Sequence, residues 1–147
     1  MGAPRIDQVN LVVPDAASAA RFLADLGVEL PEVDAAWEEW APHHRQVPAA
    51  EPCSSDLDSS AVAAWWGGLP PGFAGVVVTV RVDTREEVDR LHAEALGLGA
   101  TPLKDPHDAF WGARCAVVQA PGPVAVGIMS PTDDARRSAG PEITDFA

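Results

Sequence analysis

The segment from Ile6 to Val13, IDQVNLVV, alternates between two sets of residues, and one set contains Val9, Leu11 and Val13. Because successive side chains of an extended chain point to opposite faces, this pattern predicts a strand. One face of that strand is apolar, and the other is partly polar.

The next segment has helical spacing. Its apolar side chains recur at Ala19, Phe22, Leu23 and Leu26. Asp15 stands where a helix N-cap is expected, and Gly27 supplies a C-terminal stop. A strand, a turn and an amphipathic helix therefore follow one another.

The same pattern occurs again further along the chain. The segment 76–82, VVVTVRV, repeats the strand, and residues 84–87, TREE, form a capping box before a second helix that ends near 97–99. Segments resembling short strands follow each helix, at 37–47 and 53–58 and then at 113–119 and 123–129. The repeat predicts two β-α-β-β-β units in one α+β domain.

The boundary between the two units is marked by composition. Residues 59–66, SSAVAAWW, are typical of a short helix capped by Asp58, and GGLPPG at 67–72 is rich in turn residues. We expect a single domain over 1–131, with module one at 5–66, a linker at 67–74 and module two at 75–131. The polar tail, 132–147, is expected to be exposed, partly ordered or packed on a neighbouring subunit.

Charge and hydropathy exclude several classes of partner. The 147 residues carry a formal net charge of -12, and their ten Lys and Arg residues are scattered, which excludes nucleic acid as an expected partner. The same charge disfavours a strongly anionic ligand unless a local arginine overrides it. No apolar run is long enough to span a membrane, and no secretory h-region precedes the first strand, so we expect a cytoplasmic protein.

Motifs for covalent chemistry are absent from the sequence. Cys53 and Cys115 lie in no CxxC or CxxH spacing, so we interpret both as reduced and structural. There is no GxSxG elbow, and GGLPPG lacks the lysine of a phosphate-binding loop.

Three segments carry a family resemblance. They are IDQVNLVVPD at 6–15, DAFWGARCAVV at 108–118 and APGPVAVGIMSP at 120–131. Together they resemble the glyoxalase/bleomycin-resistance/extradiol-dioxygenase group, the vicinal oxygen chelate superfamily, from Ile6 to Pro131. The resemblance implies two incomplete barrels of curved sheet that form a ligand cleft, commonly within a homodimer.

In metal-using members of that superfamily, the resemblance places ligands at Gln8 and Asp56 in module one and at Val77 and Gly127 in module two. Neither a valine side chain nor a glycine coordinates a divalent ion, which needs several N or O donors. We therefore expect no metal and no cofactor. The missing side chain at Gly127 is also expected to leave space for a larger molecule.

The histidines offer one further polar contact. His43 and His44 are adjacent on a presumed strand and so point to opposite faces, which allows at most one of them into the cleft; His43 is the candidate. His92 on the second helix and His107 in a presumed loop are interpreted as surface or hydrogen-bonded histidines.

Aromatic side chains dominate the remaining candidates. The chain has five tryptophans and no tyrosine, and indoles stack well on planar ligands. The candidate ligand contacts are Trp37, Trp40, Trp66, Phe110 and Trp111. The alternative for each tryptophan, and for Trp65, is a place in the core or in an interface.

Polar and flexible side chains complete the predicted site. Gln8, Asn10 and Thr79 share the inner face of the first strands, and Met129 would face the same cleft. Arg114 resembles a family arginine; the alternative is a surface ion pair.

Three interpretations of the function remain open. The first is a metal-free binding protein that sequesters a hydrophobic aromatic natural product or antibiotic, as in self-resistance. The second is an enzyme of the same fold, a lyase, isomerase or dioxygenase-like protein acting on a natural-product intermediate, and a histidine or aspartate with a strongly shifted pKa would favour it. A regulatory or structural dimer is a third interpretation.

Overall fold

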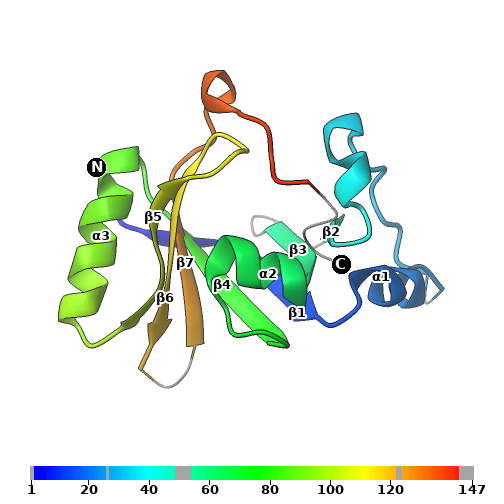
Figure 1. Ribbon diagram of the computed structural model, residues 1–147, viewed down its shortest axis with the longest axis horizontal. Coiled ribbons are helices and arrows are strands. Elements are labelled where there is room, and N and C mark those ends of the chain that lie inside the picture. The colour runs from blue at the N-terminus through cyan, green and yellow to red at the C-terminus, as the bar shows by residue number, and fades with distance from the viewer. Residues whose placement is uncertain (1, 26, 49–53, 122–123, 143–147) are drawn as a thin grey trace. The chain divides into compact units, whose positions relative to one another are not determined.

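The computed structural model in Figure 1 describes residues 2–25, 27–48, 54–121 and 124–142. The chain divides into two compact units. We call Gln8–Val76 the N-terminal unit and call Val77–Glu142, with the residues up to Asp7, the C-terminal unit.

The N-terminal unit follows the predicted order with one difference. Its elements are β1 (Arg5–Val13), α1 (Ala16–Asp25), the 3-10 helix η1 (Ala35–Trp40), β2 (His44–Val47), β3 (Ser54–Ser59) and α2 (Ser60–Gly67). Strand β3 lies in the middle, parallel to β1 and antiparallel to β2. Within its described residues the unit therefore has one strand fewer than the expected pattern.

The C-terminal unit contains the full β-α-β-β-β pattern. Its elements are β4 (Gly75–Arg81), α3 (Arg85–Gly97), β5 (Thr101–Asp108), β6 (Arg114–Ala120), β7 (Val124–Met129) and the 3-10 helix η2 (Asp134–Arg136). The strands lie in the order β4-β7-β6-β5, with β4 and β7 parallel and the other pairs antiparallel. Helix α3 packs on this sheet through Val88 and Leu91 (Figure 1).

The predicted helix caps are formed at α1 and α3. The Asp15 carboxylate accepts a hydrogen bond from Ser18 N (3.0 Å), and Thr84 Oγ1 accepts one from Glu87 N (3.3 Å). At α2 the cap is Ser59 and not the expected Asp58. Asp58 is instead held by other side chains, which are described below.

Two local predictions were wrong. The segment 37–47 was expected to be strand-like, but Asp34 accepts from Ala36 N and starts η1, so β2 begins only at His44. Conversely, β5 was not predicted, because Pro102 and Pro106 interrupt its pattern. Prolines are tolerated there because β5 lies at the edge of the unit's strand order and its register is irregular. His107 therefore lies on a strand and not in a loop.

The described part of the tail returns to its own unit. Asp133 N donates to Gly112 O (3.1 Å), and Ser138 N donates to Phe110 O (3.0 Å). A side chain at Gly112 would place its Cβ 2.3 Å from Asp133 O, so glycine permits this close approach. The tail is exposed, as expected, and its packing on a second subunit stays a prediction. Among the described helices, none has the length and apolar character of a membrane span.

Candidate functional site

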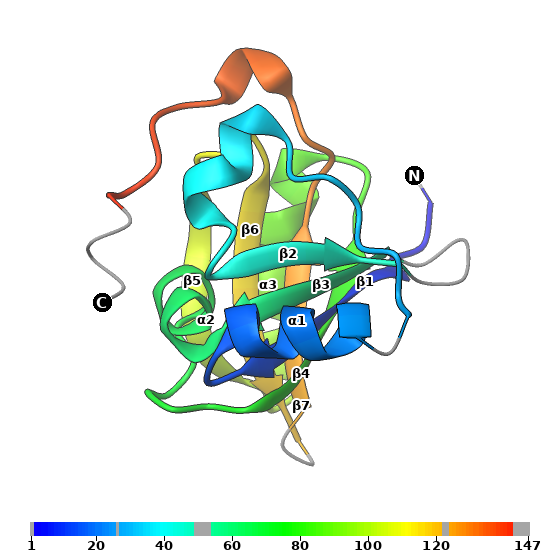
Figure 2. The same ribbon diagram turned by 90° about the vertical axis from the view of Figure 1, so that its right-hand side faces the viewer.

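The strands of the N-terminal unit present two different faces. Leu11, Val47 and Leu57 pack with helix α1, which lies across these strands in Figure 2. Because side chains alternate along each strand, the residues between them point to the opposite face. That face holds a polar cluster, which consists of Gln8, Asn10, His44, Asp56 and Asp58.

The strand register explains why these side chains meet. Asn10 lies opposite Asp56 in the parallel β1–β3 pair, and His44 lies opposite Asp58 in the antiparallel β2–β3 pair. Residues opposite one another in register lie on the same face of a sheet. Three strands thus bring together residues that are far apart in sequence.

A continuous chain of hydrogen bonds runs through the polar cluster. Gln8 Nε2 donates to Asp56 Oδ2 (2.6 Å) and to Asn10 Oδ1 (3.0 Å), and Asn10 Nδ2 donates to Asp58 Oδ2 (2.7 Å). The other Asp58 oxygen, Oδ1, lies 2.5 Å from His44 Nδ1. In the described part of the chain, no hydrogen bond is formed by His44 Nε2. The carboxylate of Asp58 therefore orients the imidazole.

Burial makes this cluster electrostatically unusual. Asp58 is 1% exposed and Asp56 is 9% exposed. Burial raises the pKa of Asp56 to about 6; the charge of nearby His44 opposes this rise, and that of Asp58 adds to it. For His44, burial would lower the pKa, but the hydrogen bond to Asp58 and the charges of both aspartates raise it above its ordinary value. Asp56 is therefore able to exchange a proton near neutral pH, and His44 is favoured in its charged form beside the two aspartates.

Aromatic rings flank the polar cluster. The ring centroid of Trp37 lies 5.1 Å from that of His44 and 6.3 Å from that of Trp40, and Trp40 lies 6.1 Å from Trp65. Trp40 is buried, whereas Trp65 is 36% exposed. Helices η1 and α2 thus place three indoles in one aromatic cluster, Trp37–Trp40–Trp65.

Two of the predicted residues, His43 and Trp66, are not the ones that join the polar cluster and the aromatic cluster. His43 lies in the turn before β2, and its Nδ1 atom is 2.9 Å from Ser59 Oγ. The histidine in the polar cluster is His44. Trp66 is half-buried on α2, and its neighbour Trp65 makes the contact with Trp40.

Asp58, His44 and Trp65 were missed as site residues. Alternation along the segment 54–59 was the available signal for Asp58, since it places this residue on the same face as Asp56. For His44, the turn that ends at His43 sets which of the two histidines begins the strand, and this turn was not predicted.

Strands β4 and β7 of the C-terminal unit correspond to β1 and β3. The space beside Gly127 on β7 is filled. Thr79 is buried and lies opposite Gly127 in register. A Cβ atom at Gly127 would lie 2.6 Å from Thr79 Oγ1. The expectation that Gly127 leaves room for a larger molecule was therefore wrong, because the threonine side chain occupies that position.

The other candidates of the C-terminal unit pack locally. Trp111 and Met129 lie against a buried cluster that contains Cys115, and Phe110 makes an edge contact with Trp111 at 5.2 Å. Burial raises the pKa of the Cys115 thiol to about 12, so it is not a reactive thiolate at neutral pH. Cys53 lies outside the described residues.

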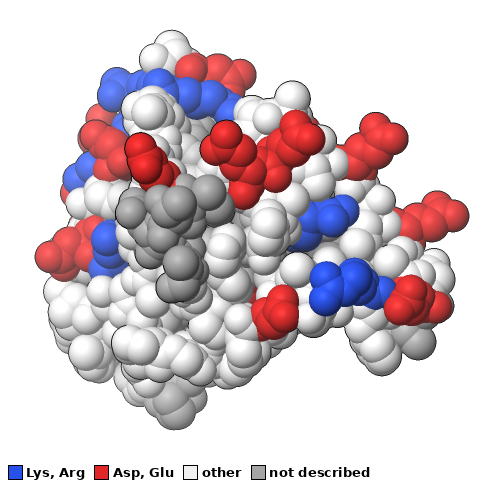
Figure 3. Space-filling view, turned by 45° about the vertical axis from the view of Figure 1, so that its right-hand side comes forward, with Lys and Arg blue, Asp and Glu red and all other residues white. Residues whose placement is uncertain are grey.

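Arg114 forms the ion pair that was the alternative to ligand contact. Its guanidinium donates two hydrogen bonds of 2.6 Å to Asp89 and one of 3.0 Å to Asp108. These bonds raise the pKa of Arg114 and lower those of the two carboxyls. Acidic and basic side chains are similarly interspersed on the face seen in Figure 3, without a continuous basic stripe.

Among the described residues, no group of three or more His, Cys, Asp or Glu side chains is placed to hold a metal ion. Two of the four positions that the resemblance implied are Val77 and Gly127, which offer no donor side chain. The chemistry that the polar cluster does offer is hydrogen bonding and proton exchange beside aromatic rings.

Comparisons with known proteins identify the fold. No protein-family model matches the sequence, and no curated protein matches it. Among solved structures, an NAD-dependent benzaldehyde dehydrogenase from Legionella pneumophila is 16% identical, with a TM-score of 0.60 over 84% of this chain and 96% of its own. A homoprotocatechuate 2,3-dioxygenase from Brevibacterium fuscum, in complex with 3,4-dihydroxyphenylacetate, is 21% identical, with a TM-score of 0.56 over 87% of this chain.

This chain spans 36% of the length of that dioxygenase. A glyoxalase/bleomycin resistance protein/dioxygenase from Nocardioides is also matched, at 19% identity over 90% of this chain and 87% of its own, but its TM-score is only 0.36. The likeness to the dioxygenase shows that this chain has the vicinal oxygen chelate fold. It does not transfer an activity, because different functions share one fold.

Proposed function

We propose that this protein binds a hydrophobic, aromatic natural product or antibiotic without a metal, and that it acts by sequestration. The observation that carries the proposal is the aromatic cluster Trp37–Trp40–Trp65 next to the polar cluster of β1, β2 and β3. Small-molecule sites typically combine apolar walls with a few oriented polar groups. Indole faces add stacking on planar rings at little cost in side-chain entropy.

The fold neighbour from Brevibacterium fuscum supports an aromatic ligand class. Its ligand, 3,4-dihydroxyphenylacetate, has an aromatic ring. We carry over only the ligand class, since the low identity leaves the activity of the neighbour with that protein. We further propose a homodimer that works in the cytoplasm.

Fluorescence titration with 2-naphthol, an uncharged planar probe, tests the proposal. We expect saturable quenching of tryptophan emission, and Trp37→Leu should weaken binding by about tenfold, because a stacked base or ring contact is worth about 1–3 kcal/mol. Trp111→Leu is the matched control in the C-terminal unit. If Trp111→Leu weakens binding and Trp37→Leu does not, the aromatic cluster is not the site.

A second candidate function is acid–base catalysis. The oriented pair of His44 and Asp58, together with the raised pKa of Asp56, favours it. Incubating the protein with candidate natural products and recovering them for mass analysis separates the two functions. Sequestration predicts that the compound is recovered unchanged. Turnover that His44→Gln abolishes, with binding retained, would instead identify an enzyme.

Native mass spectrometry completes the test, with the protein as isolated and after addition of nickel, zinc or iron. A metal-free dimer agrees with sequestration, whereas one tightly held metal per site would overturn it.

A further inference from the structure

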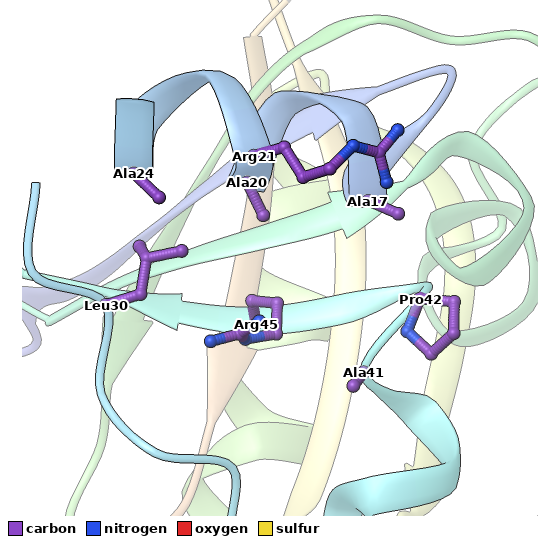
Figure 4. A pocket seen from close by; sticks show the side chains of 8 residues that line it. All are labelled: Ala17, Ala20, Arg21, Ala24, Leu30, Ala41, Pro42 and Arg45. Carbon is purple, nitrogen blue, oxygen red and sulfur yellow. The ribbon is translucent and has the colours of Figure 1, made fainter. Parts of the chain in front are cut away.

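A groove lies on the opposite side of the N-terminal sheet from the polar cluster. It runs between helix α1 and the segment that leads into β2, as the close view in Figure 4 shows. Its volume is about 520 Å³, within the range of small-molecule sites. The groove is lined by Ala17, Ala20, Arg21, Ala24, Leu30, Ala41, Pro42 and Arg45.

Most of this lining is apolar and small. Ala17, Ala20 and Ala24 follow one face of α1, and Leu30 and Pro42 face them from the other side of the groove (Figure 4). A larger residue at these alanine positions would fill the space. The helix therefore leaves room where an amphipathic helix usually carries leucine or isoleucine.

Among the described residues that line the groove, the only charged side chains are two arginines on opposite walls. Arg21 extends from α1, and Arg45 extends from β2 (Figure 4). Arg21 donates to Ser18 Oγ (2.9 Å), and Arg45 donates to Pro31 O (3.2 Å), so each uses a neutral acceptor. No salt bridge of either is found among the described residues, although Arg21 contributes to the lowered pKa of Asp15.

Six arginines in the described part of the C-terminal unit pair with carboxylates instead. They are Arg81, Arg85, Arg90, Arg114, Arg136 and Arg137. In a chain with a net charge of -12, carboxylates are abundant. Among the described residues, Arg21 and Arg45 share the lack of a carboxylate partner with Arg5, but these two line the same small-residue groove.

We propose that this groove is a second ligand site, which binds a free small-molecule carboxylate with an apolar body. The carboxylate would take hydrogen bonds from Arg21 and Arg45, since a guanidinium matches the geometry of a carboxylate. The apolar body would cover the alanines of α1. The site is separate from the aromatic cluster, because neighbouring residues His44 and Arg45 on β2 point to opposite faces of the sheet.

Isothermal titration calorimetry with octanoate tests this site. We expect saturable binding with a Kd below about 1 mM, which corresponds to about -4 kcal/mol. Octanol and octylamine have the same chain without the negative charge, so they should bind at least about tenfold more weakly, a difference of about 1.4 kcal/mol. Equal binding of all three would overturn the proposal.

Variants assign the binding to the groove. Arg45→Gln and Arg21→Gln should each weaken octanoate binding at least about fivefold, because each removes a charge-assisted hydrogen bond. Ala24→Leu, at an exposed position of α1, should block the groove. Arg90→Gln on α3 is the matched control and should leave binding unchanged.

Octanoate binding that survives Arg45→Gln, Arg21→Gln and Ala24→Leu would overturn the proposal. Circular dichroism of each variant confirms that the fold is retained. Failure here leaves the aromatic site untouched, since 2-naphthol carries no carboxylate and its binding is tested by Trp37→Leu.

Discussion

The two units of this protein use the same strand pair for different purposes. In each, the first strand lies parallel to the last. In the N-terminal unit that pair places Asn10 opposite Asp56, and in the C-terminal unit it places Thr79 opposite Gly127. The first pair carries two hydrogen-bonding side chains, whereas the second pair fits one side chain into the space left by a glycine.

The difference shows that two units with a similar strand pattern can bury different kinds of side chain. Buried polar groups cost stability unless they are hydrogen-bonded, so a polar cluster needs a complete set of partners. The N-terminal unit supplies them from three strands. At the corresponding strands the C-terminal unit buries a threonine beside a glycine, and ion pairs such as Arg85–Asp108 and Arg114–Asp89 join its more exposed groups. Each of the following changes tests one side of this comparison.

The largest expected effect comes from Asp58→Ala. It removes the acceptor for Asn10 and His44 and leaves both buried or half-buried donors without a partner. We expect a loss of about 3–5 kcal/mol in the free energy of unfolding, measured by urea denaturation. Asp25→Ala, at an exposed position, is the control and should cost much less. Similar losses for the two variants would show that the polar cluster does not stabilise the unit.

In the C-terminal unit, Gly127→Ala should cost about 1–3 kcal/mol, because the new methyl group would collide with the Thr79 hydroxyl. The double variant with Thr79→Ala removes the obstructing atoms and should recover part of this loss. Urea denaturation of the two single variants and the double variant measures the coupling. Strict additivity of the two single effects would refute the close packing of this pair.

Asp56→Asn should stabilise the protein at pH 7 by about 1–3 kcal/mol, since it removes a carboxyl whose burial disfavours the charged form. The folded protein holds the Asp56 proton up to a pKa of about 6, whereas the unfolded chain releases it near the ordinary value of 3.8. Stability contributed by this group therefore falls as pH rises through that window.

The raised pKa of His44 acts in the same direction, because its contribution is present below the ordinary pKa and is lost as pH rises through the folded value. Thermal unfolding of the wild type and of Asp56→Asn between pH 4 and pH 7 checks the statement about Asp56, whereas the loss expected from His44 lies at higher pH. A wild-type stability that rises across this range more steeply than that of the variant would contradict the assignment to Asp56.

The smallest effect is expected for Arg114→Gln. Its bonds join a half-buried guanidinium to the exposed carboxylates of Asp89 and Asp108, which solvent screens. We expect a loss of about 0–1 kcal/mol at low salt that shrinks further in 0.5 M NaCl. Ligand binding should be unchanged, which thermal-shift and titration measurements establish together. A large loss of 2-naphthol binding would return Arg114 to the ligand site.

Local patterns predicted much of the fold. Alternation in β1 and β4, and the caps at Asp15 and Thr84, depend on residues close in sequence, and the structure confirms them. Strand β5 was missed, since Pro102 and Pro106 contradict a strand until its edge position is known. Helix η1 was missed because the Asp34 cap is a short-range signal within a segment that otherwise suggested a strand.

The candidate site was predicted only in part. Gln8, Asn10, Trp37 and Trp40 lie in or beside the polar cluster, as their positions on the inner face and in the aromatic pair suggested. Pairing across strands decided the rest, because the β2–β3 register sets His44 opposite Asp58.

By itself, the sequence determined the repeated strand-and-helix pattern, the α+β class and the polar face of the first strand, since each depends on spacing within a few residues. Only the tertiary structure decided that Asp58 is held by Asn10 and His44, that Thr79 occupies the space beside Gly127, and that Arg21 and Arg45 line one groove. These contacts join segments distant in the chain, and their energies depend on burial and register, which no local pattern encodes.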